Sequence, residues 1–231
     1  MGRDAVPSQL NRTPMRDTIY ENVLGLIRTG ELAPGEIIHE DEIAVWLSVS
    51  RPPVREAMVK LEANGFIEGR AGARAMISEV SARDVAMRER MVVSLLCTAV
   101  EATLFPLSAN DRSSIVQAAA EFNIAVAGAT GSEFEAIAEF DSRVIELADA
   151  PALNQSYHER LRPHLLRRTQ YSASSPFAQR GPEFVSSMSD ALVAGDQDAV
   201  LAMLEKLRAQ CVARLVDTTR SAVAGGQGGD S

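Results

Sequence analysis

Apolar residues recur every three to four positions between Met15 and Thr29, which predicts an amphipathic helix closed by Gly30. The apolar stripe of this helix consists of Ile19, Val23, Leu24 and Ile27. The next segment, "LAPGE", predicts a type II turn around Pro34-Gly35, because proline and glycine suit its two central positions. A short strand is expected at "EII" (36–38), and a second helix at "DEIAVWL" (41–47).

A third helix is expected to start behind Ser50, with the serine as N-cap and with Pro52 and Pro53 in the first turn. Asn64-Gly65 ends this helix, whose buried stripe consists of Val54, Ala57, Met58 and Leu61. The stretch "FIEGRAGARAMIS" (66–78) predicts two short strands around a glycine-containing tip. Three helices and a hairpin describe a winged helix-turn-helix.

The pattern becomes helical throughout after Ile77. Long amphipathic helices are expected over 81–105, 108–128, 132–149, 151–170, 182–194 and 196–216. Their starts carry capping residues, namely Ser81 with Asp84, Ser108, Asp196 and a capping box at Ser132 and Glu135. The predicted fold class is therefore mainly α, with an N-terminal winged helix-turn-helix and a C-terminal all-α bundle of about six helices.

Four segments follow from this pattern. Residues 1–14 are polar and are expected to form a disordered arm, and 15–79 form the winged helix-turn-helix domain. Residues 81–220 form the all-helical domain, and the glycine-rich 221–231 are expected to be a disordered tail. The pattern contains no internal repeat.

Composition narrows the class of protein. Of the 231 residues, 46% are hydrophobic, which suits a folded chain with a sizeable core. Cys97 and Cys211 match no metal or redox spacing, and a reducing compartment is the default. The N-terminus lacks the apolar region of a secretory signal, and no apolar run approaches the ~18 residues of a membrane span. A cytoplasmic protein without membrane contact is therefore expected.

Charge is distributed unevenly along the chain, whose formal net charge is −8. Residues 50–74 form a small basic island, with five basic residues against three acidic ones. Arg51 and Arg55 are four positions apart and share one flank of the third helix. Ion pairs with Glu56 or Glu62 on a solvated face are one interpretation. Display of the two arginines to DNA is the other, because net charge matters less for binding than where the charge lies.

The sequence "IRTGELAPGE" followed by "IAVWLSVSRPPVREAMVKLEANGFIE" resembles the DNA-binding domain of the GntR family of bacterial transcription regulators. The resemblance implies that Arg51 and Arg55 are the principal contacts in the major groove. It also places Ser50 and Pro52 at the DNA backbone, and Gly72 where the wing approaches the minor groove. Arginine suits this role because it can bind guanine O6 and N7 with two hydrogen bonds.

Three departures from the family pattern are visible. The turn between the second and third helices usually carries glycine, and Ser48 stands there, so a mildly strained turn is expected. Asp41 stands where relatives often have arginine, so a phosphate contact is lost or reversed. The usual Arg-Gly pair at the wing tip is replaced by Ala73-Arg74, which leaves either Arg70 or Arg74 to reach DNA.

The helical second domain resembles the FadR-type subgroup, whose C-terminal (FCD) domain senses a small molecule. Many members bind a divalent metal through an aspartate and three histidines. Asp141 matches the aspartate, but Ile145, Val185 and Leu207 stand at the histidine positions. No bound metal and no other cofactor is therefore expected. Asp141 could also be an internal hydrogen-bond or salt-bridge partner.

The remaining histidines and one arginine complete the candidates. His158 and His164 are six apart, about 120° around a helix, so a structural or surface role is favoured over joint metal binding. Arg88 matches an arginine that can face the cavity in relatives, although a solvated position is equally open. The resemblance implies that Arg88 and Asp141 bind the effector, a small carboxylate or a more hydrophobic acyl-type molecule.

These observations predict a dimeric, ligand-controlled transcription factor, most simply a repressor, that binds a short palindromic operator in double-stranded DNA. An enzyme is disfavoured, because no cluster of His, Asp and Glu at ligand spacing and no nucleophile–base pair is apparent. The other alternative is a winged helix that docks a protein partner and does not read DNA sequence.

Overall fold

The computed structural model describes residues 14–71, 74–128, 132–165 and 180–226. The chain divides into two compact units, Met1–Glu79 and Val80–Ser231. Residues 1–13 of the predicted arm (1–14), the wing tip (72–73) and residues 227–231 of the predicted tail (221–231) lie outside the described residues.

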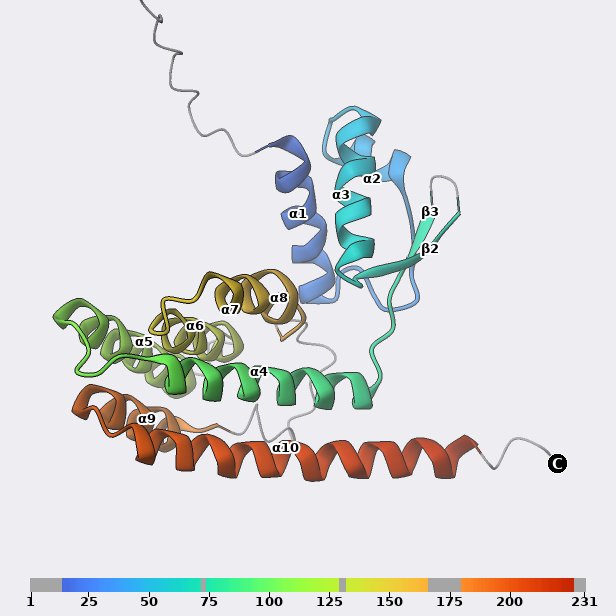
Figure 1. The fold of residues 1–231 in the computed structure, drawn as a ribbon. Helices are drawn as coiled ribbons and strands as arrows, with labels where there is room; N and C mark the ends of the chain where they lie inside the picture. Colours follow the sequence, from blue (N-terminus) through green and yellow to red (C-terminus); the bar gives the residue numbers. More distant parts are fainter. Residues whose placement is uncertain (1–13, 72–73, 129–131, 166–179, 227–231) are drawn as a thin grey trace, which may run out of the picture. The chain divides into compact units, whose positions relative to one another are not determined.

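The N-terminal unit is a winged helix-turn-helix, as the sequence predicts (Figure 1). Its elements are α1 (Met15–Thr29), β1 (Ile37–His39), α2 (Glu40–Trp46), α3 (Arg51–Ala63), β2 (Ile67–Ala71) and β3 (Arg74–Ile77). The antiparallel sheet has the order β1-β3-β2, so the wing hairpin is extended by the short strand that precedes α2.

One apolar core holds this unit together. The predicted stripes of α1 and α3 are both buried, and Phe66 and Ile77 from the hairpin close the core beside Leu61. The predicted turn is also confirmed: the amide of Glu36 donates to the carbonyl of Ala33 at 3.0 Å, and Gly35 has the positive φ of 80° that a type II turn requires.

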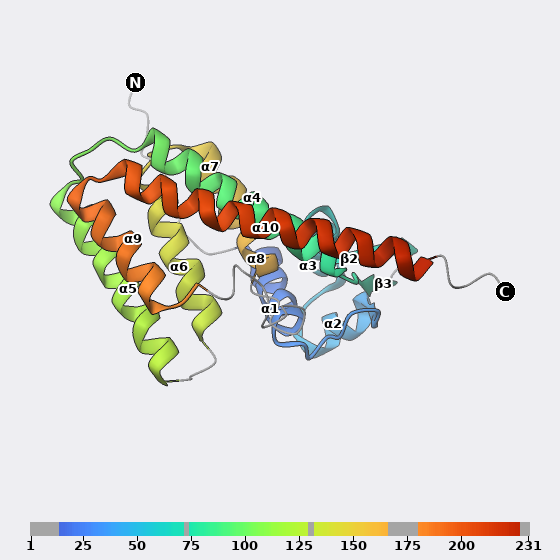
Figure 2. The ribbon, with the colours of Figure 1, turned by 90° about the horizontal axis from the view of Figure 1, so that it is seen from below.

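The second unit is all-helical in its described part. It contains α4 (Ala82–Ala102), α5 (Ala109–Gly128), α6 (Glu133–Glu146), α7 (Pro151–Gln155), the π-helix η1 (Ser156–Leu161), α8 (Arg162–Leu165), α9 (Pro182–Ala194) and α10 (Gln197–Gly226). α4 and α10 lie side by side and antiparallel in both views, while α5 packs against α6 and α9 (Figures 1 and 2). α7, η1 and α8 form one continuous rod, so this part contains about the predicted number of helices.

The structure confirms three of the four N-caps predicted for the helical unit, and the fourth is wrong. Ser81 and Asp84 form a complete capping box, and the amide of Asp111 donates to the Ser108 hydroxyl. The Asp196 carboxylate accepts from the amide of Ala199. At the start of α6, however, Ser132 makes no capping hydrogen bond, and its ψ of 11° differs from the extended backbone that capping serines adopt.

Candidate DNA-binding surface and effector site

The first turn of α3 presents the two predicted arginines to solvent. Val54 and Met58 anchor this helix in the core, which leaves the opposite flank exposed. The side chains of Arg51 and Arg55 are 67% and 63% exposed, respectively. Two guanidinium groups are therefore available together at the end of α3 that a major groove would receive.

Ser50 occupies the N-cap position of α3, but its side chain makes no capping hydrogen bond, so that part of the prediction is wrong. A capping hydroxyl accepts from the amides of the second or third helical residue. These residues are Pro52 and Pro53, which have no N–H. The same absence removes two of the amides that would make this helix end an anion site. Only the amides of Ser50 and Arg51 remain free at this helix end, and the Ser50 hydroxyl is not engaged in a cap.

Each arginine is paired with a carboxylate from the first turn of α2. Nε of Arg51 lies 2.8 Å from Oδ1 of Asp41, and its Nη2 donates to Oδ2 at 3.0 Å. Nε of Arg55 donates to Oε2 of Glu40 at 3.2 Å, and the Glu40 side chain is only 1% exposed.

The sequence interpretation had named Glu56 and Glu62 as possible partners, and Glu56 instead lies 3.6 Å from Arg16. The run of three acids that starts α2, residues 40–42, was the available signal for the pairs with Arg51 and Arg55.

The turn between α2 and α3 has the strain predicted for it. Ser48 has a φ of 54°, a left-handed conformation that residues with a Cβ rarely adopt. The amide of Val49 donates to the carbonyl of Ala44 at 2.9 Å, which fixes the backbone through the turn. This turn sets the position of α3 relative to α2, and hence brings Arg51 within reach of Asp41.

The wing is described in part. β2 and β3 pair in antiparallel register from Ile67 opposite Ile77, with an irregularity between Glu68 and Ala71. Arg74 is exposed at the start of β3, directly beside the tip. The backbone of Arg70 belongs to β2, and its side chain lies outside the described residues, as does Gly72. Which wing residue reaches DNA stays a prediction.

The interior of the helical unit holds a buried ion pair where relatives of the FadR type are expected to hold a metal. Asp141 on α6 receives two hydrogen bonds from Arg180, at 2.6 Å from Nη1 and 2.9 Å from Nη2. Both side chains are almost completely buried, at 0% and 1% exposure. Asp141 is therefore the partner of an internal arginine in this structure. The sequence interpretation missed Arg180, which is 39 residues away along the chain.

The three positions that lack histidine are part of the same core. Ile145, Val185 and Leu207 are all buried. Tyr157 is buried next to them and donates its hydroxyl to the carbonyl of Ala138 at 2.9 Å. Burial raises the pKa of the Tyr157 phenol well above its ordinary value, so this hydroxyl is neutral. The described residues contain no group of three or more His, Cys, Asp or Glu side chains that could hold a metal ion.

The other candidates occupy separate places. Arg88 lies half-buried on α4, one turn after Asp84. Nε2 of His158 lies 3.7 Å from Oε1 of Glu146, near the surface, whereas His164 is buried. Both cysteines are buried, and burial raises the pKa of the Cys97 thiol above its ordinary value and the pKa of the Cys211 thiol to about 11. Thiols with raised pKa values are poor nucleophiles and poor metal ligands at neutral pH.

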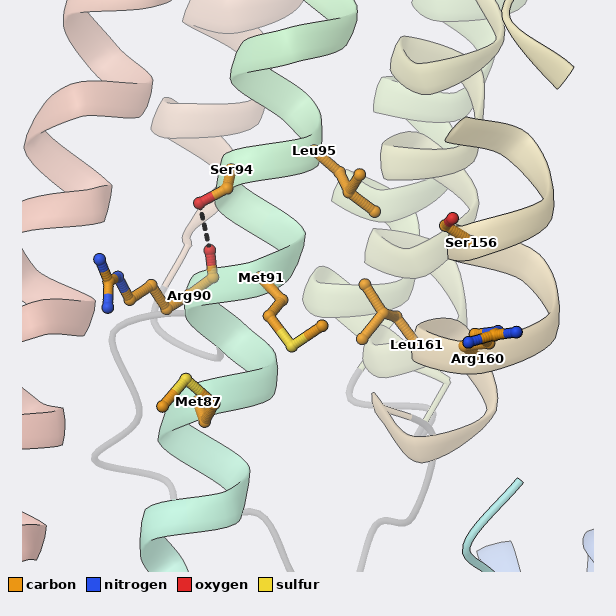
Figure 3. Close-up of a pocket in the computed structure, with 8 residues that line it drawn as sticks. All are labelled: Met87, Arg90, Met91, Ser94, Leu95, Ser156, Arg160 and Leu161. Carbon is orange, nitrogen blue, oxygen red and sulfur yellow. Dashed lines mark hydrogen bonds between the residues drawn. The ribbon is translucent and has the colours of Figure 1, made fainter. Parts of the chain in front are cut away.

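A pocket of about 400 Å³ lies between α4 and η1 (Figure 3). Met91 and Leu161 point toward one another across it, and Met87 and Leu95 extend its apolar wall. Arg90 and Ser94 line the α4 side, and the η1 side carries Ser156 and Arg160. The Ser94 hydroxyl donates to the carbonyl of Arg90 at 2.9 Å. The apolar side chains between the two helices suit an apolar ligand, whereas the guanidinium groups of Arg90 and Arg160 point away from one another on opposite sides (Figure 3).

Exposed arginines at the start of the second helix of a helix-turn-helix, in a unit that also carries a β-hairpin wing, are the arrangement by which proteins of the winged helix-turn-helix class bind DNA. Residues 15–77 match the family described as bacterial regulatory proteins, gntR family. The match covers most of the N-terminal unit, which is therefore similar to the DNA-binding domain of that family.

The relatives agree with this class. The HTH-type transcriptional repressor RspR of Escherichia coli K12 is 38% identical over 81 residues, which are 35% of this chain and 36% of RspR. The similarity thus spans about a third of the length of this curated relative.

Similarity of fold extends much further along the chain. The structure of E. coli McbR/YncC has a TM-score of 0.67 at 18% identity and covers 90% of this chain and 100% of its own. A transcriptional regulator GntR from Rhodococcus sp. RHA1 has a TM-score of 0.70 at 19% identity, over 87% and 99% of the two chains.

Among the described residues, no helix combines the length and apolar character needed to cross a membrane.

Proposed function

We propose that the protein is a ligand-responsive bacterial transcription regulator of the FadR-type subgroup, which binds a short palindromic operator as a homodimer. The observation that carries this proposal is the pair of exposed arginines, Arg51 and Arg55, on one flank of α3. A helix that enters the major groove by its N-terminal end brings such a pair to the base edges. A regulator of this kind is expected to work in the bacterial cytoplasm, where its operator lies.

The remaining contacts are assigned around these two arginines. Ser50 and Pro52 flank Arg51 and would approach the sugar-phosphate backbone, where the serine hydroxyl can donate to phosphate. Arg74, exposed beside the wing tip, is the proposed wing contact, with Arg70 as its alternative. Gly72 between them would allow close approach of the wing backbone to the minor groove.

Repression is proposed by analogy with the relative. RspR is named a transcriptional repressor, and its similarity covers the winged domain. A repressor needs its operator affinity to change when an effector binds, and the helical unit is the proposed sensor. Two-fold symmetry of the dimer would be mirrored in a palindromic operator.

The proposed effector is a small carboxylate or an acyl-type molecule with an apolar tail. The pocket between α4 and η1 supports an effector with an apolar tail, since its walls are apolar, and Arg90 or Arg160 would have to turn inward to bind a carboxylate. Arg88 stays a proposed effector residue on the same helix. Asp141 is the weaker of the two residues named from the sequence, because an effector that used it would first have to displace Arg180.

DNA binding by variants tests the proposal. The wild-type protein first selects an operator from a library of random 20-base-pair duplexes, and affinities are then measured by fluorescence anisotropy. Arg51→Ala and Arg55→Ala are each expected to lose about 1–3 kcal/mol of operator binding and to relax specificity at one base pair. Arg208→Ala is the matched control, since it removes an exposed, ion-paired arginine from the helical unit. Undiminished operator binding by both variants would reject the assignment.

A second candidate function has one supporting observation. Val45 and Trp46 are adjacent on α2 and both exposed, which is the kind of surface that a protein partner can cover. The winged unit would then be a protein-interaction module without sequence-specific DNA binding. Salt separates the two functions, because phosphate contacts release counterions and make DNA affinity fall steeply between 50 and 200 mM salt. Failure to select any operator, with flat salt dependence, would favour the second function.

A further inference from the structure

We propose that Asp41 is a positioning residue that presents the guanidinium of Arg51 to a guanine and thereby sets the specificity of DNA binding. The inference rests on the proposed function. It follows from the geometry of one exposed ion pair in the N-terminal unit and from the donors that this pair leaves unused.

The Asp41 carboxylate binds one edge of the Arg51 guanidinium and leaves the other edge open. It takes Nε and Nη2, at 2.8 and 3.0 Å. A guanidinium carries five N–H donors in a rigid plane, so both donors of Nη1 and one donor of Nη2 remain. One donor of Nη1 and the remaining donor of Nη2 form the end of the fork. Recognition of guanine O6 and N7 by arginine needs two parallel donors, and the open edge supplies them.

Pre-ordering is the physical reason that such a pair affects specificity. Arg51 has a long, flexible side chain that is 67% exposed, and a free side chain of this kind reaches phosphates as readily as bases. Asp41 restricts it to one direction, which lowers the conformational entropy that guanine binding would cost. Turning Arg51 toward a phosphate would leave a carboxylate unpaired beside the DNA backbone. Contact with phosphate at a wrong sequence is therefore disfavoured.

The strength of the Asp41–Arg51 ion pair depends on its exposure to water. An ion pair whose side chains are 67% and 52% exposed contributes little to the stability of the free domain. In a DNA interface from which water is excluded, the same charges interact more strongly. In the neighbouring pair, Nε of Arg55 donates to Oε2 of Glu40 at 3.2 Å. Glu40 is buried in the domain, so its substitution would also disturb folding. Asp41 is exposed, so it can be substituted without disturbing the core of the domain.

Asp17 provides a matched control within the same domain. It accepts a hydrogen bond from Lys60 near the end of α3 at 3.1 Å, and its side chain is partly exposed. Lys60 is nine positions after Arg51, about 13 Å along the helix at 1.5 Å per residue. Asp17→Ala changes the net charge as Asp41→Ala does, but leaves Arg51 paired.

The experiment uses the full-length protein and the operator that the wild type selects from random duplexes. Each G·C pair of that operator is replaced singly by A·T, and an unrelated duplex measures non-specific binding. Asp41→Ala is expected to discriminate about tenfold less at one G·C pair. It should be the same base pair whose replacement leaves the operator affinity of Arg51→Ala unchanged. Affinity of Asp41→Ala for the unrelated duplex should rise, with a salt slope steeper by about one, since Arg51 is then free to reach a phosphate.

The outcomes separate this inference from the proposed function. Full discrimination by Asp41→Ala, while Arg51→Ala loses it, would overturn the inference and leave the function intact. An equal gain of affinity for every duplex, as a change of net charge alone would give in Asp17→Ala, would also overturn it. Failure of the wild type to select an operator would remove both. Asp41→Asn keeps the size of the side chain and loses the charge and one acceptor, so it must lose discrimination in the same direction.

Discussion

Ser48 shows at the scale of one residue how the recognition helix is held in place. Its φ of 54° stores strain in the turn before α3, and this strain is expected wherever the family's usual glycine is absent. Ser48→Gly should therefore raise the free energy of unfolding of the winged unit by about 1 kcal/mol.

Trp46 is the only tryptophan of the chain and lies two residues from this turn, so its fluorescence in a urea titration reports on the winged unit. Ser48→Ala is the control, because alanine retains the Cβ and should leave stability nearly unchanged. Equal midpoints for Ser48→Gly and the wild type would mean that Ser48 carries no strain.

Residues differ in how far the sequence could predict their role. The strain at Ser48 followed from the resemblance to the GntR family, whose usual glycine it replaces, and the exposure of Arg51 followed from the helical period, which is a local signal. The cap expected from Ser50 was wrong for an equally local reason, since Pro52 and Pro53 offer no amide to it. Predicting the Asp41–Arg51 pair would have required the angle between α2 and α3. Predicting the partner of Asp141 would have required knowledge of a contact with Arg180, 39 residues further along the chain. Long-range pairing of charges leaves no periodic trace in a sequence.

The bounds of an element were predicted closely where the apolar stripe and a terminating residue indicate the same end. α1 and α9 have the predicted bounds, because Gly30 and Gly195 end them in left-handed conformations. α10 continues to Gly226, beyond the predicted end near 216, since its last part has no proline or other strong breaker before the terminal glycines. The π-helix within 151–165 was not predicted, because the apolar pattern of a single wide turn is indistinguishable from that of an α-helix.

The Asp141–Arg180 pair joins α6 to the segment that leads into α9, and its loss is a prediction at the scale of elements. Arg180→Met should lower the free energy of unfolding by about 3–5 kcal/mol, because it leaves a buried carboxylate without its charged partner. Circular dichroism at 222 nm during a urea titration measures the helix content, most of which lies in the helical unit.

Two further variants test the cause. Asp141→Asn combined with Arg180→Met should recover part of the loss, since no unpaired buried charge remains. Arg208→Met, which removes an exposed pair with Glu205, should change stability by less than about 1 kcal/mol. A loss in Arg180→Met no larger than that of the Arg208 variant would contradict the account.

The whole molecule combines an acidic chain of net charge −8 with a basic island around α3. This distribution limits loose attachment to DNA, because like charges keep most of the surface away from the phosphates. Native mass spectrometry of the purified protein, without added metal, tests its proposed assembly. A mass of two chains without a metal increment is expected, and an organic adduct would identify the effector class.

One metal ion per chain in that spectrum would contradict the interpretation of Ile145, Val185 and Leu207. A monomer at micromolar concentration would contradict the proposed palindromic operator, since the symmetry of the protein and of its site are coupled. Neither result would affect the description of the winged domain or the proposed role of its exposed arginines.

The buried pair in the helical unit also constrains how the proposed sensor domain could have diverged. Converting Asp141 into a metal ligand by restoring three histidines would not suffice, since Arg180 already occupies both of its carboxylate oxygens. Removing Arg180 first would expose the chain to a folding defect, and adding the histidines first would place polar groups in a packed core. Intermediates on either route are impaired. Metal-binding and arginine-filled sensors are therefore expected to form separate lineages, with few sequences between them.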